Sequence, residues 1–184
     1  NIGQMLIFTN NSTFSVNNFA SFTFENDSPL VGLFWGVQMG IKDGSFSALH
    51  NATFSFTNKQ PLEALSYVAS QFALSQCDFK VLDNASFVFD NQSDIAGISS
   101  AQLLIDSGNS FRTISFFTGD YAKFDFKNTG NMTYGTGTAQ MMIDSFRGTN
   151  NVFIRNNAEF NFKNKSLIHA DFNAAQLLIR GSSV

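Results

Sequence analysis

The chain is poor in the residues that mark several classes of protein. It has one cysteine, Cys77, which excludes a framework of disulfide bonds within the chain. Its two histidines, His50 and His169, offer no spacing with that cysteine that would suit zinc. Charged residues make up 14% of the chain, and the net charge of −3 favours neither nucleic acid nor an anionic membrane surface as a partner. We therefore expect no metal, no cofactor and no nucleic acid.

Proline and long apolar runs are scarce as well. The two prolines, Pro29 and Pro61, each stand just before an apolar stretch, where a missing N–H group disturbs a strand least. No run reaches the roughly 18 apolar residues of a membrane-spanning helix. The chain starts without a signal peptide, so we expect it to be a piece of a longer repeat-containing protein.

Phenylalanine is in excess, with 23 of 184 residues, and much of it lies in an internal repeat. The unit recurs eleven times at spacings of 15 to 21 residues, and such repetition predicts an architecture of stacked units. Five copies have the form Ala-x-Phe-x-Phe-x-Asn, at 20–26, 52–58, 85–91, 122–128 and 158–164. Six copies have Gln at the second position and mostly aliphatic residues later; they start at Gly3, Val37, Ser70, Ala101, Ala139 and Ala175.

The fifth position of the repeat alternates between aliphatic and aromatic side chains from copy to copy. Apolar residues at every second position predict a short strand with one buried face. Asn, Ser or Gly at the seventh position predicts where that strand ends. The side chains at the fifth position, which we expect to form a structural ladder, are Ile7, Phe24, Ile41, Phe56, Leu74, Phe89, Ile105, Phe126, Ile143, Phe162 and Ile179.

One such strand per repeat predicts a parallel β-solenoid, because hairpins would need two-residue turns that the sequence lacks. Taking each repeat as one coil gives an all-β, single-stranded parallel β-helix of about eleven coils of ~17 residues, in one domain over 1–184. At about 4.8 Å per coil, the rod would be roughly 50 Å long. In this scheme aromatic and aliphatic side chains interdigitate in one ladder, and the glutamines face outward. The charges at the sixth position alternate in sign from Asp106 to Lys163.

No motif in the chain assembles a catalytic site. Carbohydrate-active enzymes on this scaffold need two or three carboxylates that converge on an outer face. Asp125 points outward, but its counterparts Val88 and Asn161 carry no carboxylate. His169 and Asp171 share a strand face, and no nucleophile accompanies them. We therefore expect no catalytic residue and no enzyme. A polysaccharide-degrading β-helix enzyme or a tailspike-type depolymerase is the alternative.

One apolar stretch predicts a binding surface. Residues 30–35 are apolar at both odd and even positions, so in a strand one of the two sets of side chains must face outward. We expect Leu33, Phe34 and Trp35 to form this patch; coverage by a neighbouring loop is the alternative. Aliphatic residues at the fourth position, such as Leu104 and Met142, also point outward in this scheme. They suggest lateral association of rods, and open strand edges suggest end-to-end self-association.

The blocks Asn-Ala-x-Phe-x-Phe-x-Asn at 51–58, 84–91 and 157–164 resemble the passenger repeats of vacuolating-cytotoxin-like autotransporters of Helicobacter. The similarity, which lies in the repeated blocks and in a composition rich in Phe and Asn and poor in Cys, covers nearly the whole chain. It implies a right-handed parallel β-helix that is exported through the outer membrane of a Gram-negative bacterium to the cell surface or the medium. The signal sequence and the C-terminal translocating barrel of that family are not within these residues.

The resemblance further implies a non-enzymatic role in adhesion, colonisation or toxin action. We therefore expect a surface-exposed or secreted passenger segment that serves as a stalk or a binding surface. Its partner would be a host cell-surface protein or glycan. A pore-forming toxin segment is a further alternative, which would need apolar surface and oligomerisation.

Overall fold

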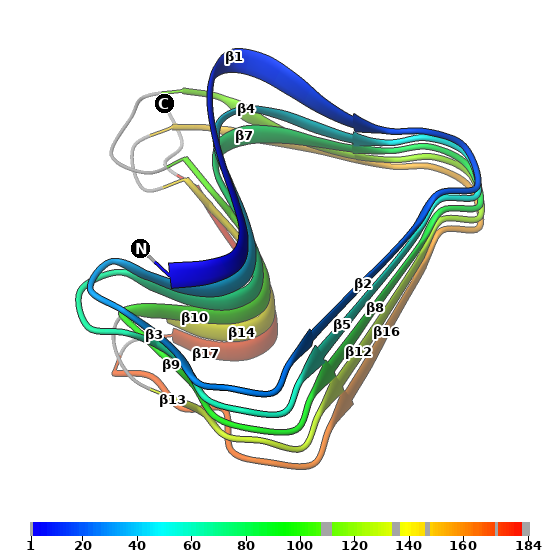
Figure 1. Ribbon diagram of the computed structural model, residues 1–184. Helices are drawn as coiled ribbons and strands as arrows, with labels where there is room; N and C mark the ends of the chain where they lie inside the picture. Colours follow the sequence, from blue (N-terminus) through cyan, green and yellow to red (C-terminus); the bar gives the residue numbers. More distant parts are fainter. Residues whose placement is uncertain (1, 108–111, 134–136, 146–147, 172, 182–184) are drawn as a thin grey trace.

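The structure, a computed structural model, describes residues 2–107, 112–133, 137–145, 148–171 and 173–181. These residues form only strands, bends and turns, and every strand pair is parallel. They contain no long apolar helix of the kind that crosses a membrane. The chain winds around a three-sided core, and strands from successive turns lie on one another (Figure 1). The predicted all-β parallel solenoid is confirmed.

Sheet A is the largest of three sheets, and its long strands bend around a concave side (Figure 1). Its main path is β1 (Ile2–Val16), β4 (Trp35–Ala48), β7 (Val68–Val81), β10 (Ser99–Asp106), β14 (Gly137–Ser145) and β17 (Asn173–Gly181). The second half of each long strand continues in later turns as a separate strand: β11 (Ile114–Thr118) pairs with the end of β7, and β15 (Asn150–Ile154) pairs with β11.

Sheets B and C close the other sides of the coil. Sheet B stacks β2 (Ser21–Asn26), β5 (Thr53–Asn58), β8 (Ser86–Asn91), β12 (Lys123–Asn128) and β16 (Glu159–Asn164). Sheet C stacks the short strands β3 (Leu30–Gly32), β6 (Leu62–Ala64), β9 (Ile95–Ala96) and β13 (Met132–Thr133). Each turn of the chain passes through sheet A, then sheet B, then sheet C.

The predicted count of eleven coils is wrong, because one turn consumes two repeats. Gln-bearing copies lie in sheet A and phenylalanine-bearing copies in sheet B, so register partners are 31 to 38 residues apart. The chain makes about five turns. At about 4.8 Å per turn the stack is roughly 24 Å deep instead of 50 Å. A turn of 17 residues would be too short to enclose a core lined by phenylalanine on several sides.

The ladder at the fifth position is therefore two ladders. The phenylalanines stack on each other in sheet B, with ring centroids 4.9 to 5.1 Å apart: Phe24, Phe56, Phe89, Phe126 and Phe162. The aliphatic residues stack in sheet A: Ile7, Ile41, Leu74, Ile105, Ile143 and Ile179. The predicted interdigitation of the two kinds is wrong, because successive copies occupy different sides of the core.

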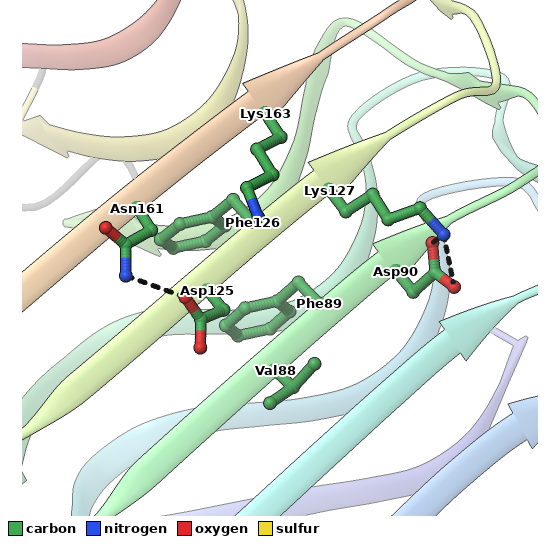
Figure 2. Close-up of a pocket in the computed structure, with 8 residues that line it drawn as sticks. All are labelled: Val88, Phe89, Asp90, Asp125, Phe126, Lys127, Asn161 and Lys163. Carbon is green, nitrogen blue, oxygen red and sulfur yellow. Dashed lines mark hydrogen bonds and ion pairs between the residues drawn. The ribbon is translucent and has the colours of Figure 1, made fainter.

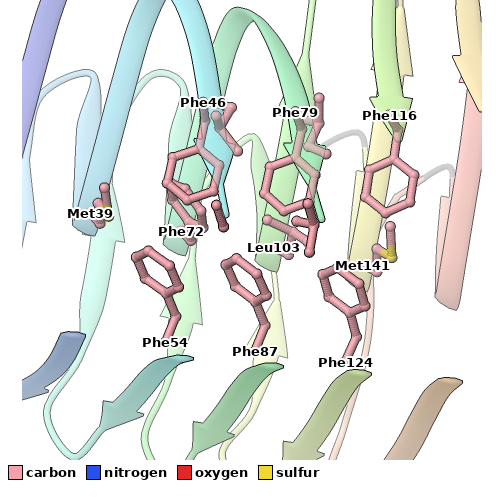
Figure 3. Close-up of a cluster of buried hydrophobic side chains, with 14 of the residues drawn as sticks. Met39, Phe46, Phe54, Phe72, Phe79, Phe87, Leu103, Phe116, Phe124 and Met141 are labelled. Carbon is pink, nitrogen blue, oxygen red and sulfur yellow. The ribbon is translucent and has the colours of Figure 1, made fainter. Parts of the chain in front are cut away.

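Aromatic side chains from two sides meet inside the solenoid (Figure 3). Phe46 of β4 contacts Phe54 of β5 edge to face, at a centroid distance of 5.4 Å, while it stacks on Phe79 of the next turn at 5.3 Å. Offset stacks and edge-to-face contacts are the favoured arrangements of aromatic rings, each worth about 0.5–1.5 kcal/mol beyond area burial. The excess of phenylalanine thus supplies ten of the twelve largest fully buried side chains.

The Asn residues of the repeat perform two different tasks. The first Asn of the motif, as in Asn51, Asn84 and Asn157, has φ near 59° at the corner before sheet B. Asn tolerates this left-handed conformation better than most residues. The last Asn of the motif ends the strand, as predicted. In the middle turns it also points inward, and Asn91 donates its side-chain amide to Oδ1 of Asn128 at 2.7 Å.

The glutamines face inward, which corrects the outward placement expected from the sequence. Gln38, Gln71, Gln102 and Gln140 are fully buried where sheet A approaches the end of sheet B. Gln102 donates Nε2 to Oε1 of Gln71 at 3.1 Å, and also to main-chain oxygens of β8 and β12. These strands bend at the second position, so its side chain is not on the face that simple alternation assigns.

A second core lies on the other face of sheet A. The fourth-position side chains Leu104 and Met142, predicted to face outward, are buried there with Trp35, Val37 and others. Gly40 is required in this packing, because a Cβ atom at that residue would come within 2.5 Å of the Trp35 ring. The curvature of sheet A provides this second interior, which a flat strand would not have.

Candidate functional site

A shallow groove of about 280 Å³ crosses the outer face of sheet B (Figure 2). Its floor is formed by the strands at Phe89 and Phe126, whose rings are packed in the core below. Six outward side chains from three successive strands surround it: Val88, Asp90, Asp125, Lys127, Asn161 and Lys163. Because the parallel register fixes each strand on the next, these side chains are held on a rigid floor.

Four of the five polar side chains in the groove are already paired with one another. Asn161 donates Nδ2 to Oδ1 of Asp125 at 2.8 Å, and Lys127 donates Nζ to Oδ2 of Asp90 at 3.3 Å (Figure 2). Lys163 forms no ion pair with any described residue, and its register neighbour is Lys127, which has the same charge. The groove therefore combines an ammonium group for an anionic partner with oxygen and amide groups suited to hydroxyls.

A buried polar cluster lies at the sixth position of sheet A. Asp106 and Asp144 are register partners, Tyr67 donates its hydroxyl to Asp106, and Arg180 donates Nε to Asp144 at 2.9 Å. Burial raises the pKa of Tyr67, and the Asp106 carboxylate raises it further. The hydrogen bond to Asp144 raises the pKa of Arg180. The predicted alternation of charge is wrong here: like-charged Asp106 and Asp144 are adjacent, and Lys127 lies in sheet B.

Carboxylates on neighbouring strands are the arrangement that a glycosidase would use. Both of these carboxylates are buried, however, and each is bound to a side chain of the chain itself. We therefore interpret the cluster as part of the packing between turns. The recurrence of Ile-Asp-Ser at 105–107 and 143–145 was a sequence signal for this pair of acids. It was missed because a model with one repeat per coil places Lys127 between Asp106 and Asp144.

Only part of the predicted patch at residues 33–35 is exposed in the structure. Leu33 and Phe34 are 55% and 53% exposed in the bend between β3 and β4, while Trp35 is 5% exposed and packs in the second core. Leu65, at the equivalent bend one turn later, is 66% exposed. An exposed apolar strip thus runs along the corner between sheets C and A, without Trp35.

The other chemistry-bearing residues are scattered. His50 Nδ1 lies 3.6 Å from Oδ2 of Asp83 at an exposed corner. No hydrogen bond or ion pair joins His169 to Asp171 in the described part of the chain, and both are exposed. Cys77 is buried, and this burial raises its pKa to about 11, so the thiol is protonated at neutral pH. The described ranges hold no group of three or more His, Cys, Asp or Glu side chains arranged for a metal ion.

Together these observations define a parallel β-solenoid built from two alternating repeats, with a polar groove on one outer face. The chain matches no protein-family model, no curated protein sequence and no solved structure.

Proposed function

We propose that this chain is a non-enzymatic segment of a surface-exposed or secreted bacterial protein, which binds a host glycan or protein through the outer face of its solenoid. The observation that carries the proposal is the groove on sheet B. Its polar side chains project from a floor held by the stacked phenylalanines, so little order has to be gained on binding. The resemblance of the Asn-Ala-x-Phe-x-Phe-x-Asn blocks to autotransporter passenger repeats supports the bacterial surface as its setting.

The groove suits a hydroxyl-rich ligand that carries an acidic group. Asp125 and Asn161 provide an acceptor and donors for sugar hydroxyls, and Lys163 provides a cation for a carboxylate. The exposed strip at Leu33, Phe34 and Leu65 is apolar, and is better suited to a protein partner. One substitution in each surface can therefore distinguish glycan binding in the groove from protein binding on the apolar strip.

Binding to a glycan array and to host cells tests the proposal. Asp125→Ala is expected to weaken glycan binding at least tenfold, about 1.4 kcal/mol, because it removes the acceptor and frees Asn161. Ser55→Ala is the matched control. It lies at the same outward position of sheet B two turns earlier, outside the groove.

Each other outcome has a definite meaning. Loss of binding with Phe34→Ala but not with Asp125→Ala would move the site to the apolar strip and a protein partner. Release of reducing ends from a bound polysaccharide would favour the enzyme alternative. No binding to any glycan or cell would contradict the binding role, and would leave a stalk that positions other regions.

A further inference from the structure

The outer face of the second half of sheet A carries a cluster of aromatic and basic side chains. In β11 the side chains alternate between the core and the outside, and residues in register form rows across the strands. One outward row contains Lys80 of β7, Phe117 of β11 and Phe153 of β15. Arg155 follows β15 directly. We call these four residues the basic–aromatic cluster.

The two cations of the cluster are held against the same ring. Nζ of Lys80 lies 5.8 Å from the ring centroid of Phe117, and Cζ of Arg155 lies 5.3 Å from it. They come from the two turns that flank β11. A cation–π contact orients an exposed cation, at about 0.5–1 kcal/mol, without neutralising its charge. Both positive charges are therefore placed on the surface in advance of any ligand.

Neither of these two cations forms an ion pair with a residue that the structure describes. The acids on this side of the molecule have other partners. Asp78, on the same face, lies 3.3 Å from a guanidinium nitrogen of Arg112 and accepts the main-chain N–H of Ser115 at 2.9 Å. Asp83, at the corner after β7, lies 3.6 Å from Nδ1 of His50. The charge of the cluster therefore remains available to an anionic ligand.

The surroundings of the cluster suit a sugar. Ser47 is the register partner of Lys80, and Ser115 and Asn151 are partners in the adjacent outward row, so hydroxyl and amide groups flank the cations. The ring of Phe153 is 56% exposed and offers a flat apolar surface for the face of a sugar ring. Charge, hydroxyl groups and an aromatic surface are thus combined on one rigid sheet.

Other anionic partners fit this face less well. A peptide cannot join it as an added strand, because β11 is already paired with β7 and β15 on its two sides. Nucleic acid takes most of its affinity from many phosphate contacts, and the cluster offers two cations. The face must therefore recognise its ligand through a few side chains.

We propose that the basic–aromatic cluster binds a glycan chain whose sugars carry carboxylate or sulfate groups. The anionic groups lie against Lys80 and Arg155, and a sugar ring lies against Phe153. The two cations are two turns apart, about 10 Å by the strand spacing, so anionic groups on different sugars of one chain meet them. The cluster shares no residue with the groove on sheet B, so this site goes beyond the proposed function and does not depend on it.

Calorimetric titration of the 184-residue chain with chondroitin sulfate oligosaccharides tests the proposal, with neutral dextran as the reference ligand. Lys80→Gln combined with Arg155→Gln is expected to weaken binding by about tenfold or more, because both anion contacts are lost. Lys123→Gln combined with Lys165→Gln is the matched control. It removes the same charge outside the cluster and the groove, and should change the affinity by less than about twofold.

A third variant tests the aromatic contact separately from the charge. Phe153→Ser keeps both cations and is expected to weaken binding by roughly threefold or more, because the stacking surface is lost. Circular dichroism confirms that all variants fold. A wild-type chain that does not bind the oligosaccharide, equal binding of dextran, or equal losses in the two double variants overturns the proposal.

The groove and the cluster are distinguished by their own variants. Loss of binding with Asp125→Ala but not with the Lys80 and Arg155 double variant would assign the ligand to the groove and overturn this site. The opposite result would support it, even if the groove binds nothing. Tighter binding of an acidic peptide or of single-stranded DNA through Lys80 and Arg155 would overturn the assignment to a glycan.

Discussion

Single polar side chains inside the solenoid connect its sides to one another. Gln102 shows this most fully, because its Nε2 donates to Gln71 and to the main-chain oxygens of Phe89 and Lys127. Its Oε1 accepts from Nε2 of Gln140 at 3.1 Å. A side chain of sheet A thus donates to main-chain oxygens at the end of sheet B. The glutamine is therefore needed at this position for its length and its amide.

Replacing this glutamine should be costly. Gln102→Ala removes the buried amide that bonds to Gln71, Gln140 and two main-chain oxygens, so we expect the free energy of unfolding to fall by about 3 kcal/mol. Urea unfolding followed by circular dichroism measures the change. Gln4→Ala, at the exposed end of the same ladder, should lower it by less than 1 kcal/mol. Equal losses at both positions would show that burial of the glutamine is unimportant.

At the scale of elements, sheet B owes its register to the stacking of identical side chains. Phe89 of β8 lies between Phe56 and Phe126, at centroid distances of 5.1 and 4.9 Å. A shift by one residue would move every ring to the solvent side. The set of side chains on the outer face, and therefore the groove, depends on this register.

The position of a ring in the stack should determine its contribution. Phe89→Leu removes two stacking contacts in the centre, and we expect it to lower the free energy of unfolding by about 2 kcal/mol. Phe162→Leu removes one contact on the partly exposed last turn and should lower it by less than half as much. Chemical denaturation of the two variants side by side makes the comparison. The reverse order would mean that end turns limit the stability of the stack.

The whole molecule is a linear stack in which each turn contacts mainly its neighbours, so stability should be lowest at the ends. We expect amide hydrogens of β5, β8 and β12 to exchange more slowly than those of β2 and β16. Hydrogen exchange read by mass spectrometry tests this at low protein concentration. Uniform protection along the chain would contradict it.

The strands of this protein could be predicted from its sequence because their cause is local. Alternating apolar side chains, as at Phe87 and Phe89, define a strand and its buried face. Asn91 marks its end, and repetition of the block requires equivalent strands to stack in parallel. These relations hold within a few residues, so the alternation itself determined the strands and the fold class, while the composition of each ladder depended on the number of repeats per turn.

The tertiary structure alone decided how many repeats make one turn. A period of ~17 residues is compatible with one or two repeats per turn, and only the space needed for facing rings such as Phe46 and Phe54 selects two. That choice then decided which residues are neighbours: Asp106 with Asp144, and Asp125 with Asn161 in the groove. The bend of sheet A likewise buried Gln102 and Trp35, since facing inward or outward depends on curvature, which arises from packing between turns.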